Sequence, residues 1–149
     1  MLGYLTINQI ENLLYSQLIG RIGCHSDEMT YVVPITYAYD GTYIYGHTKE
    51  GMKIDMMRKN PMVCFEVDFI DNLSNWRSII SWGKFEELIK PEDREKGMQK
   101  LLDRIIPFMT GDTTIHDSMI DSHGKCIEAM KGVVYRVKLT KKTGRFEKR

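Results

Sequence analysis

The sequence predicts a mainly β fold: a small antiparallel barrel of about six strands with about three helices at its periphery. Two observations predict it. Several segments carry the period-two alternation of half-buried strands, and Asp40-Gly41 is a strong two-residue hairpin signal between two of them. The 149 residues suffice for one core and are too few for two, so residues 1–149 are expected to form a single domain.

The strands can be placed along the chain from this alternation and from turn residues. Pro34 cannot donate to a sheet ladder, so it predicts a bulge or an unpaired edge where something other than a strand approaches. Gly83 predicts a bend within a long strand. The expected strands are residues 21–25, 31–39, 42–46, 63–69, 76–88 and 133–139.

Three helices follow from capping and breaking residues. Thr6 and Gln9 form a capping box that opens the first helix, and Gly20 is expected to end it. The second helix is expected over residues 49–59, before Asn60-Pro61. Pro91 opens the third. Its apolar stripe is Met98, Leu101, Leu102 and Ile105.

Composition excludes several classes of protein. The net charge is +1, so no global field recruits nucleic acid or a membrane, and no apolar run approaches the roughly 18 residues of a membrane span. Three scattered cysteines argue against a disulfide framework and for a reducing cytoplasm. No cluster of ligating side chains predicts a metal site.

Two segments are harder to interpret. Residues 107–131 lack sustained periodicity, and their length indicates a binding or interface loop. The basic tail, residues 141–149, is expected to fray at the end of the chain.

The junction between the third expected strand and the second helix carries the clearest chemistry. His47, Thr48, Gly51 and Lys53 lie within seven residues of one another. With Thr48 opening the helix, exposed backbone N–H groups, a hydroxyl and an ammonium would converge as a phosphate requires. A solvated surface lysine is the equally weighted alternative. Glu50 would compete for the same positive helix end.

A second candidate lies at the start of the long strand. Arg77 offers a forked donor to a phosphate and Ser78 a small hydroxyl. An ion pair from Arg77 to Asp68 or Asp71 explains the arginine equally well.

These motifs together resemble a known family. The order V-P-I-x-Y, D-G-x-Y-I-Y-G-H-T and G-x-K-I-D-x-x-R-x-N-P-x-V-x-F-E-V-D is similar to the FMN-binding split-barrel proteins related to pyridoxamine 5'-phosphate oxidase. Within that group it most resembles the branch that includes nitroimidazole-resistance proteins. The resemblance runs from about the first helix to the last strand.

The resemblance implies a six-stranded split β-barrel that forms a homodimer, with FMN at the dimer interface. It implies that one strand runs along the flavin ring, that the strand-to-helix junction holds the phosphate, and that the start of the long strand also contacts the cofactor. The residues so implied are Val32, Val33, Pro34, Ile35, Thr36, His47, Thr48, Lys53, Arg77 and Ser78.

The expected function is therefore an FMN-dependent oxidoreductase of a small planar substrate, with nitroaromatic compounds among the candidates. No side chain stands out as a catalytic acid or base. The ring-facing strand carries no arginine, unlike that of true oxidases of the family, which argues against pyridoxamine phosphate as substrate. Two alternatives stay open: a flavin- or haem-binding protein without turnover, and a barrel without cofactor that acts as an interaction module.

Overall fold

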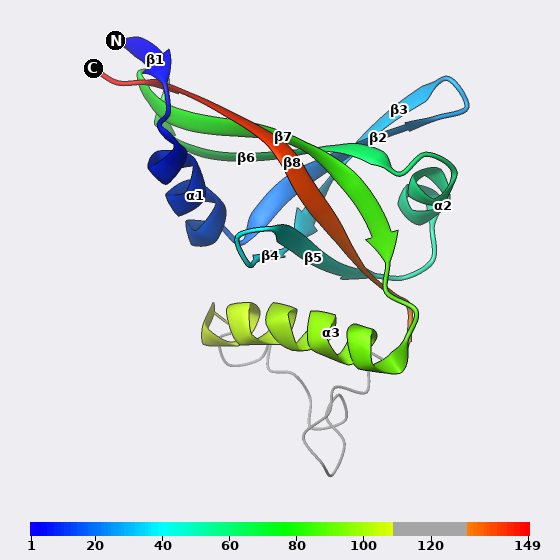
Figure 1. Ribbon diagram of the computed structural model, residues 1–149. Helices are drawn as coiled ribbons and strands as arrows, with labels where there is room; N and C mark the ends of the chain where they lie inside the picture. The colour runs from blue at the N-terminus through cyan, green and yellow to red at the C-terminus, as the bar shows by residue number, and fades with distance from the viewer. Residues whose placement is uncertain (109–130) are drawn as a thin grey trace.

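An antiparallel sheet forms most of the computed structural model, which describes residues 1–108 and 131–149 (Figure 1). Its strands are β1 (Leu2–Tyr4), β2 (Ile19–Ser26), β3 (Met29–Thr36), β4 (Ala38–Tyr39), β5 (Tyr43–Thr48), β6 (Met62–Asn72), β7 (Asn75–Glu87) and β8 (Val133–Glu147). The helices are α1 (Ile7–Ser16), α2 (Met52–Lys59) and α3 (Pro91–Ile105), followed by a short 3₁₀ turn, Ile106–Phe108. The mainly β class with three helices is confirmed.

The sheet closes on itself because one extended stretch changes partner. The strand order is β3-β2-β6-β7-β8-β5-β4, and β1 pairs with β8 beside this path. Tyr37 alone separates β3 at one edge from β4 at the other, so the sheet must curl until its edges meet. The buried Tyr37 fixes this corner, since its hydroxyl donates to the Leu14 carbonyl at 2.6 Å.

This partner change adds one strand to the six expected, and β1, which was not expected, adds another, so the described residues contain eight strands. The single strand expected over residues 31–39 is divided into β3, which pairs with β2, and β4, which pairs with β5. The Asp40-Gly41 turn does connect β4 to β5 as predicted, with Gly41 at a φ of 97°. Alternation predicted the extended backbone, but it could not predict which strands would be its neighbours.

Pro34 lies on β3, an edge strand of the sheet. Its register partner is Arg21, and the pairing of β3 with β2 continues without a shift from Ile19 to Ser26. The expected unpaired edge is therefore confirmed, whereas the alternative of a bulge is wrong. A proline at an edge also discourages uncontrolled strand addition.

The helices begin largely as predicted. Thr6 and Gln9 form the capping box of α1. The helix ends at Ser16, before Gly20, which belongs to β2. A Cβ on Gly20 would lie 2.4 Å from the Phe65 ring, so close packing, and not helix termination, requires glycine there. α3 begins at Pro91 as expected.

α3 lies across β4 and β5 (Figure 1). Met98 and Leu101 are buried against Tyr45 and Val134 in a second, smaller core. Leu102 and Ile105, from the same predicted stripe, pack at the margin of this core.

The C-terminal tail does not fray. β8 continues to Glu147 and pairs along its length with β7, and its end also pairs with β1. The expectation of a frayed tail is wrong because a basic, polar segment can still be held by a long antiparallel ladder. At Gly83 the register with β8 shifts by one residue, with Thr140 of β8 as the extra residue, and a Cβ on Gly83 would clash with the Lys138 backbone. Apart from its ends, the segment 107–131 lies outside the described residues.

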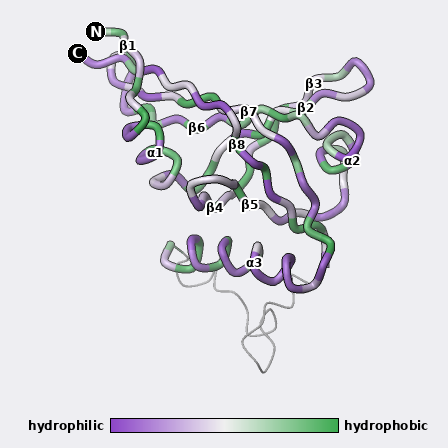
Figure 2. The backbone as a smooth tube through the Cα atoms, viewed as in Figure 1, coloured by the Kyte–Doolittle hydropathy of each residue, from purple (hydrophilic) through white to green (hydrophobic). Residues whose placement is uncertain are grey.

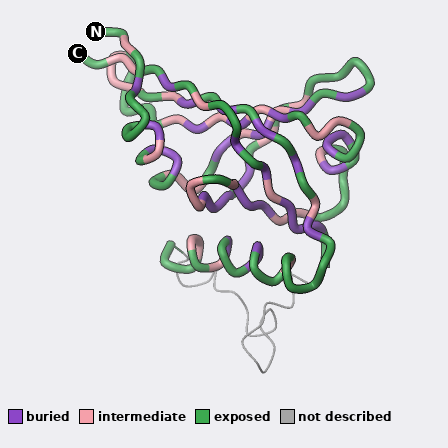
Figure 3. The backbone as a smooth tube through the Cα atoms, in the orientation of Figure 1, coloured by how far each residue is buried: buried purple, intermediate pink, exposed green. Residues whose placement is uncertain are grey.

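Buried residues gather along the inner sides of the strands and of the three helices (Figure 3). Hydrophilic residues predominate along α3 (Figure 2). The main core fills the barrel under α1 and α2. The opposite face of the strands β3, β2, β6 and β7 carries the exposed apolar residues Val32, Met62, Ile80 and Trp82. We call this the outer face.

Candidate functional site

The junction between β5 and α2 is the first part of the candidate site. His47 and Thr48 are the last residues of β5 and pair with Val134 and Val133 of β8. α2 begins at Met52, three residues after the expected start at residue 49, because Thr48 is held in the sheet. Gly51 occupies the N-cap without a side-chain hydrogen bond, so the first N–H groups of α2 receive no side-chain cap.

Lys53 is the most informative side chain of this junction. It is half-buried in the first turn of α2, and no described carboxylate lies within ion-pair distance of it. Burial lowers the pKa of Lys53, while the nearby Cys24 thiol has the weaker opposing effect. An ammonium that has lost water without gaining a partner is in place to receive an anion.

Cys24 explains why Lys53 is half-buried. The thiol points inward from β2 and is buried at 3% exposure, and α2 packs against β2. Burial raises the pKa of Cys24 despite the opposing charge of Lys53. The thiol therefore stays neutral and does not neutralise the lysine.

The imidazole of His47 is held by the start of β8. Its Nε2 lies 2.9 Å from the carbonyl oxygen of Lys131, and because a carbonyl can only accept, Nε2 is the protonated nitrogen. Gly132 makes this approach possible: it has a φ of 76°, and a Cβ there would lie 2.5 Å from the Thr48 carbonyl oxygen. The ring is thus fixed in orientation, with Nδ1 left on its other side.

Glu50 does not occupy the positive end of α2. Its carboxylate accepts two hydrogen bonds from Arg58, at 2.7 and 2.9 Å, and this contact lowers the pKa of Glu50. Arg58 also donates to Glu87 on β7. The competition expected from the sequence is therefore reduced, because the arginine holds the carboxylate.

The edge strand β3 lies close to Lys53. Cys24 interacts electrostatically with Lys53, and it pairs with Tyr31 at the beginning of β3. Val33 and Ile35 face the core, whereas Val32, Pro34 and Thr36 are exposed. The structure therefore places the beginning of β3 near Lys53, on the other side of Cys24, and the residues of β3 alternate between the two faces of the strand.

Arg77 and Ser78 lie at the opposite end of β8. His47 pairs with Val134, whereas Arg77 pairs with Phe146. Twelve residues of strand between these positions correspond to roughly 40 Å along β8, which curves with the barrel. One chain does not bring these two parts of the predicted site together.

Arg77 and Ser78 also face opposite sides of the sheet, because they are neighbours on one strand. Arg77 shares a face with its register partner Phe69, and its guanidinium lies 5.3 Å from the centre of that ring. Ser78 faces outward and donates to Glu66 at 3.4 Å. Neither predicted ion pair of Arg77 is present, since Asp68 is instead held by Arg21 at 3.2 Å.

The outer face combines a charged cluster with exposed apolar side chains. Arg21 contacts Glu66 at 3.4 Å as well as Asp68, and burial, together with the charge of Asp68, raises the pKa of Glu66. A groove of about 450 Å³ runs beside the cluster, lined in part by Val32 and Trp82. Sequence reasoning did not identify this cluster, although the apolar residues on both faces of the strands indicated an unburied surface.

The family assignment follows from comparison with known proteins. The pyridoxamine 5'-phosphate oxidase family model matches residues 6–146. The chain belongs to this family, as its sequence motifs predicted.

Individual relatives extend the comparison. An uncharacterized protein of Rhizobium meliloti is 37% identical over 70 residues, and the match covers 47% of this chain and 46% of that protein. The chain thus aligns with less than half the length of this curated relative.

Solved structures show the same fold at low identity. A FAD-binding protein from Mesorhizobium loti has a TM-score of 0.75 at 24% identity, covering 98% of both chains. A putative 5-nitroimidazole antibiotic resistance protein from Bacteroides thetaiotaomicron has a TM-score of 0.74 at 18% identity, covering 98% of this chain and 87% of the other.

The same architecture occurs in a longer protein. The flavocytochrome Anf3 from Azotobacter vinelandii has a TM-score of 0.72 at 13% identity, covering 99% of this chain and 70% of that one. Within the described part of the chain, no helix has the length and apolar character to cross a membrane, and no group of three or more ligating side chains could hold a metal ion.

Proposed function

We propose that this protein is a homodimeric FMN flavoprotein that acts as an oxidoreductase on a small planar substrate. The observation that carries the proposal is Lys53, a half-buried cation without an anionic partner among the described residues. It stands in the first turn of a helix whose N-terminus lacks a side-chain cap. A phosphate would supply the missing charge and accept from the free N–H groups.

The residues present fit a flavin mononucleotide. Thr48 adds a hydroxyl at the end of β5, and His47 has a fixed ring beside it. The exposed edge of β3, with Val32 and Pro34, offers a flat apolar surface with backbone groups for a flavin ring. The Mesorhizobium loti protein is described as FAD-binding, which supports a flavin, and a junction with one uncapped helix N-terminus and one lysine favours the single phosphate of FMN.

The dimer is supported by the separation of the two parts of the predicted site. Ser78 lies on the outer face, at the far end of β8 from His47, so a cofactor at the β5–α2 junction would meet it only through a second copy. The outer face also leaves large apolar residues uncovered, among them Val32 at 61% exposure and Met62 at 58%. A two-fold dimer through this face would bury them.

The flavin would supply the electron-transfer chemistry, and the protein would bind it, orient it and exclude water. Lys53 and Thr48 would hold the phosphate, while β3 would fix the ring plane. His47, already bonded to Lys131, would act as an anchor and not as a proton donor. A planar ring stacked on an open strand edge favours flat substrates, and nitroaromatic compounds are the class to assay first.

The shared site can be tested by complementation between two variants. Lys53→Glu removes the phosphate contact, and Ser78→Tyr blocks the contact from the other copy; each alone should purify without flavin. In mixed dimers one site carries neither change, so co-expression should restore flavin in roughly a quarter of the sites. Flavin bound at full occupancy by a monomer, or no restoration in verified mixed dimers, would refute the shared site.

The absorption spectrum of the purified protein distinguishes flavin binding from the alternative of haem binding. The two described histidines, His25 and His47, both have hydrogen-bond partners, Thr30 and Lys131. No observation in the described residues favours haem. We expect flavin bands and no Soret band, with reduction by NADH or NADPH then assayed with candidate acceptors.

A further inference from the structure

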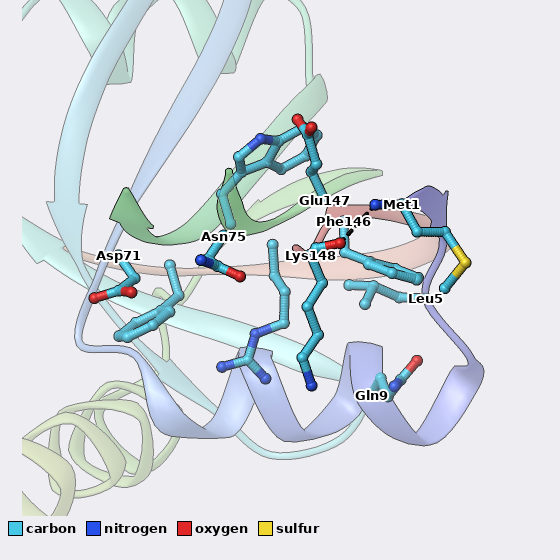
Figure 4. Close-up of a pocket in the computed structure, with 11 residues that line it drawn as sticks. Met1, Leu5, Gln9, Asp71, Asn75, Phe146, Glu147 and Lys148 are labelled. Atoms are coloured by element: carbon cyan, nitrogen blue, oxygen red, sulfur yellow. Dashed lines mark hydrogen bonds between the residues drawn. The ribbon is translucent and has the colours of Figure 1, made fainter. Parts of the chain in front are cut away.

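The hollow around Arg77 is separate from the β5–α2 junction. It lies at the end of the barrel near both chain termini, between the first turn of α1 and the ends of β6, β7 and β8 (Figure 4). Its volume is about 560 Å³, which is within the usual range for small-molecule sites. Its lining includes Leu5, Gln9, Phe69, Arg77, Phe146 and Lys148.

Its floor is formed by two aromatic rings with a guanidinium between them. Phe69, Arg77 and Phe146 are register partners on β6, β7 and β8, so their side chains share one face of the sheet. Arg77 stacks over Phe69 with 5.3 Å to the ring centre. A stacked guanidinium keeps its N–H donors available at its edge, where a carboxylate can accept two of them.

The hollow has an excess of positive charge on this face. No carboxylate of the described residues lies within ion-pair distance of Arg77 or Lys148. Lys148 points toward α1, whereas the Glu147 carboxylate points to the other side of the strand (Figure 4). Asp71 also lines the hollow, and its carboxylate accepts a hydrogen bond from Asn72 at 3.0 Å. Two cations are therefore balanced by this one carboxylate.

We propose that this hollow binds a small planar carboxylate, such as an aromatic acid, at a site distinct from the flavin site. Arg77 would hold the carboxylate through its forked donors, with Lys148 adding charge. Phe69, Phe146 and Leu5 would hold the ring. Gln9 would border the site with its amide NH₂, because its Oε1 already accepts from Thr6 in the capping box.

The test is a binding measurement with 2-naphthoate on the full chain, by calorimetry. We expect saturable binding, and binding of the neutral 2-naphthalenemethanol at least about tenfold weaker, because it lacks the charge-assisted bonds. Equal binding of the neutral compound, or no binding of either, would overturn the proposal.

Variants locate the contact. Arg77→Met should weaken 2-naphthoate binding about ten- to a hundredfold, and Arg77→Lys should weaken it less, since it keeps the charge but loses the fork. The matched control is Arg145→Met. Arg145 is an exposed arginine on β8 that pairs with Ser78 and lies on the opposite face of the sheet, so its replacement should leave 2-naphthoate affinity unchanged. If Arg77→Met binds as tightly as the wild type, the proposal fails.

Two further measurements separate this site from others. Saturating FMN should leave 2-naphthoate affinity unchanged, and displacement by FMN would show that the hollow belongs to the flavin site. Inorganic phosphate at the same concentration should not displace 2-naphthoate. Displacement by phosphate would show a general anion site and overturn the assignment to a planar carboxylate.

Discussion

Two cations in contrasting environments, Lys53 on α2 and Arg77 on β7, lie toward opposite ends of β8. At the β5–α2 end, Lys53 is half-buried, and burial lowers its pKa. At the other end, Arg77 is exposed and stacked on Phe69. The first cation is under an electrostatic penalty that an anion would relieve, whereas the second is stable in water and offers shape and donors. The contrast indicates that two cations near opposite ends of the same strand can serve different ligands.

The largest expected effect concerns the phosphate at the β5–α2 end. Lys53→Met should weaken FMN binding by about 1.5–3 kcal/mol, or roughly ten- to a hundredfold, because a charge-assisted contact is lost. Riboflavin, which lacks the phosphate, should bind about equally to both proteins. Flavin fluorescence titration measures both constants, and equal weakening of the two ligands would mean that Lys53 acts through folding.

A pair of glycine variants compares how tightly the two ends are packed. A Cβ on Gly46 would lie 2.3 Å from the fully buried Tyr135 ring, whereas a Cβ on Gly3 would meet the half-buried Phe146 at 2.8 Å. Gly46→Ala should therefore lower the free energy of unfolding by about 1–3 kcal/mol, and Gly3→Ala by clearly less. Urea denaturation measures both free energies of unfolding, and equal losses would show that the two ends are packed equally tightly.

His47→Asn tests the anchoring role beside Lys53. The asparagine loses the ring that is hydrogen-bonded to Lys131, so the β5–α2 junction should be held less firmly and FMN binding should weaken by about 0.5–1.5 kcal/mol. Turnover at saturating FMN should stay normal. A fall in saturated turnover of about 10²–10⁴, the usual contribution of acid–base catalysis, would instead make His47 a proton donor.

The β2–β3 hairpin beside α2 provides a smaller test. Asp27 and Glu28 both have positive φ, 52° and 62°, and Lys59 anchors Asp27 at 2.8 Å. Glu28→Gly should raise the free energy of unfolding by about 0.5–1 kcal/mol by relieving the left-handed conformation, without changing FMN affinity. Glu28→Ala, which keeps the strain, should show no gain.

The smallest effect is a pH dependence of the flavin-free protein. Burial lowers the Lys53 pKa, so the folded state releases this proton before the unfolded state does. The stability contribution of Lys53 should therefore rise with pH in the alkaline range below about 10.4, the ordinary lysine value. Urea unfolding at neutral and alkaline pH should show this rise in the wild type and not in Lys53→Met.

Lys59 on the same helix is the control of opposite sign. Its hydrogen bond to Asp27 raises its pKa, so its contribution is full at neutral pH and is lost as pH rises through that raised pKa. Lys59→Met should remove a loss of stability at alkaline pH, whereas Lys53→Met should remove a gain of stability at alkaline pH. The same sign for both variants would contradict the assignment of an unpaired, half-buried Lys53.

The sequence by itself determined the features that depend on near neighbours along the chain. The capping box of α1, the Asp40-Gly41 turn and Pro91 at the start of α3 each depend on a few adjacent residues, and each was predicted. The closeness of His47, Thr48 and Lys53 was also predictable, because seven residues of strand and helix cannot separate them far. The motifs identified the family for the same reason, since their order lies in the sequence itself.

The tertiary structure decided what depends on distant partners. The change of partner at Tyr37, the retention of the tail in β8 and the burial of Lys53 over Cys24 all result from contacts between segments far apart in sequence. Alternation could have shown that Arg77 and Ser78 face opposite sides, but not that Phe146 would complete the hollow beside Arg77. Pattern specifies which residues of a strand share a face, and only the folded sheet specifies what that face meets.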